Sequence, residues 1–95
     1  MNKYDGIFIF KPDLSEKDVE SEYSKAEEMI QKHGGKVEKT EKWGKKRTAY
    51  AVKKFHDGFF LYIFFEAPPE SINVLTELFK LNVNILRVQF VKKDD

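Results

Sequence analysis

Four stretches of the chain carry the apolar pattern of β-strands. Residues 4–11 are rich in aromatic and β-branched side chains and stop at Pro12, as a strand does. Residues 36–54 have no helical stripe and are expected to be extended. Residues 59–67 and 84–92 complete the set. The sequence therefore predicts four strands, and no helix separates the second from the third.

Helical periodicity marks two further segments. The first has apolar residues at steps of four, three and four, namely Val19, Tyr23, Ala26 and Ile30. Ser15 is its expected N-cap, and Gly34 with Gly35 ends it, because Gly adopts the left-handed backbone without a steric penalty. The second helix opens at Pro68 and Pro69. Its apolar stripe consists of Ile72, Leu75 and Phe79.

The order of these elements is strand, helix, strand, strand, helix, strand, which is the order of the ferredoxin-like fold. The fold class is therefore predicted to be α+β, with a four-stranded antiparallel sheet and two helices on one of its faces. The first and third strands are expected in the middle of the sheet. At 95 residues, the chain is predicted to be one domain over residues 1–95.

The second predicted strand is too long to lie straight inside the domain. Its 19 residues would span about 60 Å, whereas a chain of this length folds into a globule about 32 Å across. The segment must bend, bulge or project, and Gly44 is the expected bulge, because the apolar parity changes between Val37 and Val52. The turn that follows is expected at residues 56–58, His-Asp-Gly.

The charge is unevenly distributed, although the net charge is only +1. Residues 13–28 carry seven acids and two lysines, whereas residues 32–54 carry nine bases and two acids. The part of the second strand that leaves the globule would carry Trp43, Lys45, Lys46 and Arg47. One face of the protein could therefore approach a polyanion. The plainer interpretation is that a mixed surface keeps the protein soluble.

The sheet face without helices is expected to be partly apolar. In the last strand, Leu86, Val88 and Phe90 form one face, and the other reads Ile85, Arg87, Gln89, Val91. The third strand is apolar on both faces, and the sequence leaves open which of them meets the helices. A monomer seldom leaves such a patch bare, so this face is expected to dock RNA bases, a protein or a second copy.

Several classes of protein are excluded by composition. The chain has no cysteine, so it has no disulfide, no thiolate zinc site and no cysteine nucleophile. No apolar run approaches the roughly 18 residues of a membrane span, and the N-terminus lacks a signal-peptide core, so we expect a cytoplasmic protein. His33 and His56 are interpreted as polar surface residues, and no acidic or histidine cluster has metal-ligand spacing. We therefore expect no catalytic residue, no metal and no cofactor.

The most specific segment of the chain is residues 43–50, Trp-Gly-Lys-Lys-Arg-Thr-Ala-Tyr. Together with Tyr4-Asp5, residues 34–37 and residues 84–87, it resembles the bacterial small-subunit ribosomal protein S six family, whose motif reads Trp-Gly-x-Arg-Arg-Leu-Ala-Tyr. The resemblance covers essentially the whole chain. Lys46 departs from the motif, and lysine lacks the planar fork of arginine.

The resemblance implies a structural component of the small ribosomal subunit with no catalysis. Members of the family bind the central domain of the small-subunit ribosomal RNA together with the eighteenth small-subunit ribosomal protein. A near-neutral chain has weak non-specific affinity for RNA, which suits a protein whose RNA surface is completed by a basic partner. The alternatives are a small ferredoxin-like enzyme, a ligand-binding homodimer, or an RNA-binding regulator that needs no partner.

Two sets of site residues follow. The RNA-binding residues are expected to be Lys3, Trp43, Lys45, Lys46, Arg47 and Arg87. The partner protein is expected to dock at the edge of the second strand, beside Tyr50, Ala51 and Val52, because a bare strand edge offers unpaired backbone groups. The free protein is expected to be monomeric, without a membrane partner.

Overall fold

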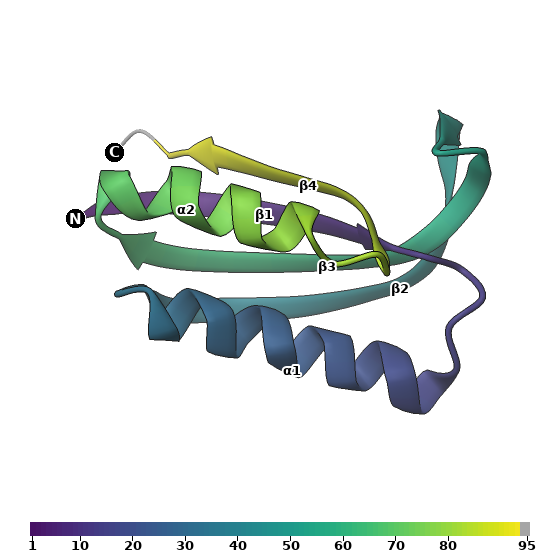
Figure 1. The fold of residues 1–95 in the computed structure, drawn as a ribbon, viewed down its shortest axis with the longest axis horizontal. Helices are drawn as coiled ribbons and strands as arrows, with labels where there is room; N and C mark the ends of the chain where they lie inside the picture. Colours follow the sequence, from purple (N-terminus) through teal and green to yellow (C-terminus); the bar gives the residue numbers. More distant parts are fainter. Residues whose placement is uncertain (94–95) are drawn as a thin grey trace.

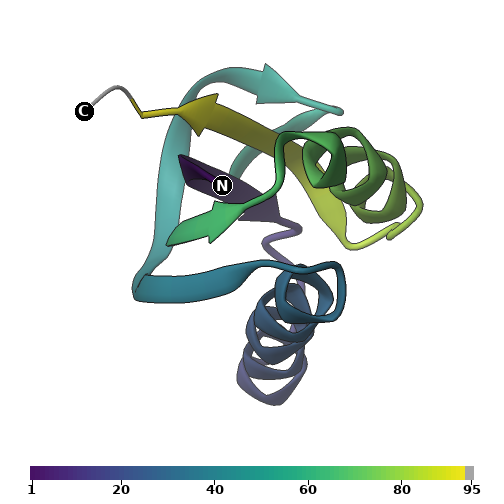
Figure 2. The same cartoon turned by 90° about the vertical axis from the view of Figure 1, so that its left-hand side faces the viewer.

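The computed structural model describes the backbone of residues 1–93, and all their side chains except those of residues 49 and 50. Its elements are β1 (Asn2–Phe10), α1 (Glu16–Lys32), β2 (Lys36–Val52), β3 (Phe55–Ala67), α2 (Pro69–Lys80) and β4 (Ile85–Lys92) (Figure 1). The strands form one antiparallel sheet in the order β2-β3-β1-β4. Both helices lie on the same side of this sheet (Figure 2). The predicted ferredoxin-like arrangement is thus confirmed.

Helix α1 begins and ends as its residues dictate. The Ser15 hydroxyl accepts a hydrogen bond from the Asp18 backbone N–H at 3.1 Å, which satisfies one of the free donors of the first turn. At the other end, Gly34 has a φ of +87°, and the Gly35 N–H donates to the Ile30 carbonyl at 2.9 Å. The predicted cap and stop are therefore both present.

The core lies between the helices and one face of the sheet. Its largest fully buried side chains are Phe8, Phe10, Ile30, Leu61, Ile63, Phe65 and Leu75. The even residues of β1 and the odd residues of β3 supply it, since residues paired across antiparallel strands share a face. The structure thus settles the parity of β3, which the sequence left open.

The turn between β2 and β3 lies at Lys53 and Lys54, which have φ values of 49° and 72°. The prediction of a turn at residues 56–58 is wrong, because these residues already belong to β3. Gly58 is needed there for packing: a Cβ at this position would lie 2.6 Å from the Phe10 carbonyl oxygen. Gly58 thus permits the close approach of two strands and does not form a turn.

Strand β2 accommodates its length by bulging and projecting. Its register with β3 shifts at three places, and one shift lies between Lys42 and Gly44, where the sequence predicts it. Gly44 has a φ of +79°, which only glycine adopts without strain. Since β1 pairs with β3 no further than Phe59, the hairpin beyond that pair projects past β1 and β4 and curves (Figure 1).

Candidate functional site

The face of the sheet opposite the helices is partly apolar. We call it the open face; it consists of the odd residues of β1 and the even residues of β3, with their partners on β2 and β4. Phe60, Tyr62 and Phe64 run along its centre and are half-buried. A hollow of about 200 Å³ lies next to this aromatic row and is lined by Ile7, Ile9, Phe60, Arg87 and Gln89. The open face therefore offers apolar surface with polar groups at its margin.

Trp43 lies on this open face. Its ring stacks on Tyr62, with centroids 5.5 Å apart and planes 9° apart, and Lys46 Nζ lies 5.4 Å from its centroid. Its Nε1 donates a hydrogen bond to Glu41 Oε1 at 3.1 Å. The residue is 40% exposed. Trp43 is thus held against the sheet, and the prediction that it belongs to the projecting part of β2 is wrong, because Tyr62 provides a flat partner nearby.

Tyr62 and Glu41 tie the aromatic pair to charged neighbours. The Tyr62 hydroxyl donates a hydrogen bond to Asp5 Oδ1. Burial, and then this hydrogen bond and the charges of Asp5 and Glu41, raise the pKa of Tyr62 to about 12. The hydrogen bond from Trp43, and then that from Lys39, lower the pKa of Glu41. The centre of the open face is therefore a connected polar and aromatic network.

The predicted RNA-binding cations are spread over the sheet. Lys46 covers the Trp43 ring on the open face. Lys45 Nζ instead lies 5.8 Å from the ring of Phe59, which is on the side of the sheet that faces the helices. Arg47 pairs in register with Asp57 on the projecting hairpin. Lys46, Lys45 and Arg47 are all exposed. The structure thus brings these three residues to one end of β2 but on different faces.

Lys3 lies at the other end of the sheet from that group, and Arg87 lies on β4, separated from β2 by β3 and β1. Lys3 pairs in register with Glu66, at the end of β3 that is far from the hairpin. Arg87 is exposed on β4, where it pairs with Ile9 and donates a hydrogen bond to Gln89 Oε1 at 3.4 Å. The structure therefore does not gather the predicted cations into one cluster.

A further cation on the open face was missed by the sequence. Lys93 Nζ lies 5.1 Å from the Phe64 ring, and the Lys93 backbone N–H donates to the Lys3 carbonyl at 2.9 Å. Lys93 is not among the cations that the sequence predicts to bind RNA. A lysine that follows directly on an edge strand is a signal that could have found it.

The predicted protein-binding edge is the outer edge of the sheet. Strand β2 pairs only with β3, so its other side has no strand along the residues that the structure describes. Ala51 is exposed and Val52 is half-buried. The side chain of Tyr50 lies outside the described residues. The position of this edge agrees with what an added strand would require.

Metal and membrane chemistry can be addressed for the described part of the chain. Among residues 1–93, no three histidine, cysteine or acidic side chains are grouped so that they could hold a metal ion. Neither α1 nor α2 is long and apolar enough to cross a membrane.

Comparison with known proteins identifies the family. The family model described as ribosomal protein S6 matches residues 3–92. A small ribosomal subunit protein bS6 from Heliobacterium modesticaldum is 32% identical over 95 residues, covering 100% of this chain and 99% of that protein. The bS6 protein of Carboxydothermus hydrogenoformans is 30% identical, over 99% of this chain and 98% of its own length. The bS6 protein of Helicobacter acinonychis is longer; it is 34% identical over 99% of this chain and 66% of its own length.

A solved structure agrees. The crystal structure of 30S ribosomal protein S6 from Thermotoga maritima superposes with a TM-score of 0.92 at 26% sequence identity, over 97% of this chain and 87% of that chain. The chain belongs to the ribosomal protein S6 family. The expectation of a non-enzymatic component of the small ribosomal subunit, and thus of a cytoplasmic protein, is confirmed by this membership.

Proposed function

We propose that the chain binds the central domain of the small-subunit ribosomal RNA together with the eighteenth small-subunit ribosomal protein. The observation that carries this proposal is the open face, where half-buried aromatic residues have no helix over them and lysines lie along the margins. A sheet face of this kind is stabilised by a partner that covers its apolar centre. Family membership supports a ribosomal setting for that partner.

In this proposal the partner protein covers the outer edge of β2 at Tyr50, Ala51 and Val52, and extends onto the open face. The hollow beside Ile7 and Phe60 would receive an apolar side chain of the partner. An edge strand next to an apolar face favours binding in which backbone pairing and side-chain burial act together.

The cations would contact RNA phosphates on either side of the partner. Lys45, Lys46 and Arg47 would serve at the hairpin end, and Lys3 at the other end of the sheet. Trp43 would position Lys46, since the lysine ammonium already lies over the indole ring. With a net charge of only +1, the free chain should bind RNA weakly, and the partner should supply the missing affinity.

A binding assay with and without the partner tests the proposal. We expect a central-domain RNA fragment to be bound weakly by the chain alone and tightly by the chain with the partner protein. Tight binding without the partner would instead support an independent RNA-binding regulator. If the chain sediments as a stable dimer and binds neither the RNA nor the partner protein, the result would support a homodimer that uses the open face.

Two variants separate the proposed roles. Lys46→Glu with Arg47→Glu should leave protein pairing nearly intact but lower the salt slope of RNA binding by about 0.7–0.9 for each lost phosphate contact. Ala51→Pro should weaken protein pairing while the monomer stays folded, because proline removes a backbone donor from the edge. An unchanged salt slope in the double variant would remove the hairpin from the RNA site.

A further inference from the structure

A second hollow lies where the projecting hairpin meets the start of β4 and the end of α2. Its volume is about 380 Å³, within the range of small-molecule sites. It is lined by Lys53, Lys80, Ile85, Leu86, Arg87 and Val88. The curved hairpin brings its turn to the same end of the molecule as the beginning of β4 (Figure 1). The projecting hairpin therefore contributes to the wall of the hollow through Lys53.

Three cations from three different elements line this hollow. Lys53 is the first residue of the hairpin turn, Lys80 is the last residue of α2, and Arg87 is on β4. Lys53 is distant in sequence from Lys80 and Arg87, so it meets them only through the fold. None of the described residues that line the hollow is a carboxylate, so Lys53 and Lys80 meet no acidic lining residue there.

The neighbouring ion pairs do not use these lysines. In the part of the chain that the structure describes, ion pairs engage Lys25, Lys36, Lys39 and Lys42, and neither Lys53 nor Lys80 takes part in one. The rest of the lining is apolar, with Ile85 and Leu86 buried and Val88 half-buried. A cationic rim over an apolar floor suits a ligand that carries an anion and a flat apolar part.

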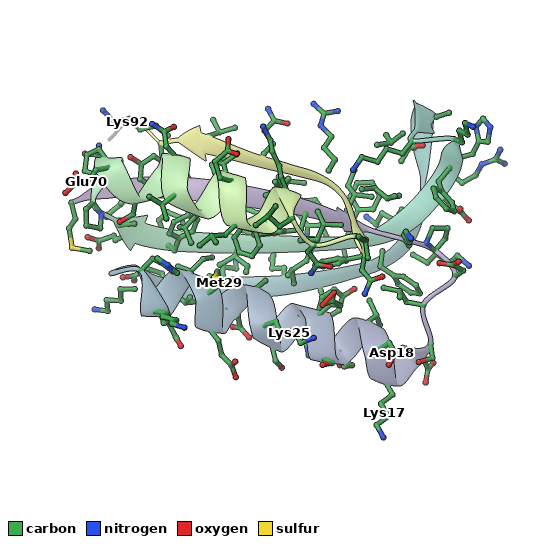
Figure 3. The ribbon with its side chains drawn as sticks, viewed as in Figure 1. Lys17, Asp18, Lys25, Met29, Glu70 and Lys92 are labelled. Atoms are coloured by element: carbon green, nitrogen blue, oxygen red, sulfur yellow. The ribbon has the colours of Figure 1, made fainter. Side chains whose placement is uncertain are left out.

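The hollow between the two helices provides a contrast. It has a volume of about 250 Å³ and is lined by both acids and bases, among them Glu22, Lys25, Glu28 and Lys32. Lys25 Nζ lies 3.7 Å from Glu22 Oε1, so its charge is already paired. Figure 3 shows Lys25 and Met29 on this helical side of the molecule. The hollow between the helices therefore has no excess of charge of one sign and does not select an anion.

We propose that the hollow of Lys53, Lys80 and Arg87 binds a backbone phosphate of RNA, with the attached nucleoside against Leu86 and Val88. The inference rests on the proposed function and adds to it a phosphate site that uses Lys53 and Lys80. RNA is favoured over an acidic protein segment because the basic residues continue along the hairpin through Lys54, Arg47 and Lys46, and a nucleic-acid backbone repeats its charge at every nucleotide. Arg87 also borders the hollow on the open face, so it would stand between RNA and partner protein.

The test uses the double variant Lys53→Gln with Lys80→Gln in the complex of the chain with the partner protein and a central-domain RNA fragment. We expect weaker RNA binding and a salt slope lower by roughly 1.5, from two contacts of about 0.7–0.9 each. Arg87 is left unchanged because it borders both hollows.

The matched control is Lys17→Gln with Lys32→Gln, which removes the same charge. Lys32 lies in the last turn of α1, as Lys80 lies in the last turn of α2, so both pairs lose the same helix-end interaction. Lys17 points away from the sheet (Figure 3). The control should leave the slope close to that of the wild type.

Each outcome bears on the site in a distinct way. A wild-type complex that binds RNA, together with a double variant that keeps the wild-type slope, overturns the site but leaves the proposed function intact. Equal losses in the test and control variants also overturn it, since only net charge would matter. If the double variant loses affinity for the partner protein when no RNA is present, the hollow is instead the site of an acidic protein segment. A wild-type chain that binds no RNA with its partner overturns the proposed function and the site with it.

Discussion

Strand β3 presents two chemically similar faces that differ in what covers them. Its odd residues Leu61, Ile63 and Phe65 are fully buried under the helices, whereas its even residues Phe60, Tyr62 and Phe64 are half-buried on the open face. Hydropathy is nearly the same on both sides, so composition does not distinguish core from docking surface. Only the position of the helices does: it makes one face the core and leaves the other uncovered, where we propose that the partners bind.

The largest expected effect comes from two adjacent phenylalanines of β3. Phe65→Ala should lower the free energy of unfolding by about 3–5 kcal/mol, because it empties a fully buried site. Phe64→Ala should cost about 1 kcal/mol or less, since that ring keeps contact with solvent and with Lys93. Urea unfolding of both variants measures the difference. Equal losses would show that the open face is also part of the core.

A buried carboxylate on the helical side should have the next largest effect. Glu22 is 4% exposed and accepts hydrogen bonds from Asn82 Nδ2 at 3.0 Å and Asn84 Nδ2 at 3.3 Å. It thereby fixes the connection between α2 and β4 against α1.

Glu22→Gln should lower the free energy of unfolding by about 1.5–3 kcal/mol, the range for hydrogen bonds to charged groups. Glu28→Gln on the exposed side of the same helix should change it by less than about 0.5 kcal/mol. The same urea measurements serve for both. If the two variants are equally stable, the polar contacts of Glu22 do not hold that connection.

Alkaline pH should act on the open face through Tyr62. Its pKa is about 12 in the folded chain against an ordinary value of 10.0, so the folded state retains the proton more strongly than the unfolded state. The resulting stabilisation is complete below about pH 10 and is lost as the pH rises towards 12. Tyr62→Phe should remove this component.

The check is the free energy of unfolding of wild type and Tyr62→Phe between pH 9 and 12. The difference between the two proteins should shrink as the pH rises, because lysine titration is common to both. A difference that stays constant over this range would mean that the hydroxyl of Tyr62 does not hold Asp5 as the structure has it.

The sequence predicted the fold well because local signals agreed with the global arrangement. The cap at Ser15, the stop at Gly34 and the helical stripe from Val19 each act within a few residues. The prediction of the turn failed for a physical reason. Gly58 is required because a Cβ there would clash with the Phe10 carbonyl oxygen, and this contact joins strands that are distant in sequence. Lysines occupy the actual turn, although positive φ values favour glycine and asparagine there.

The candidate site was less predictable because it depends on which side chains meet. The sequence indicated a basic and aromatic segment around Trp43, but not that Tyr62 would hold the indole ring on the open face. The parity of β3 could not be read from a strand that is apolar on both sides. Nor could the meeting of Lys53, Lys80 and Arg87 be foreseen, since it requires the curvature of a bulged hairpin.

The smallest expected effect concerns Trp43, the only tryptophan in the chain. Because its ring is stacked on Tyr62 and covered by Lys46, its fluorescence in the free protein should be only partly accessible to acrylamide. Tyr62→Ala should shift the emission to longer wavelength and increase quenching, because it removes the ring on which Trp43 is stacked. Phe60→Ala, on the same strand and face, is the control and should leave the emission unchanged. If Tyr62→Ala has no effect on quenching, the stacked pair is absent in solution, and Trp43 would be free to contact RNA bases directly.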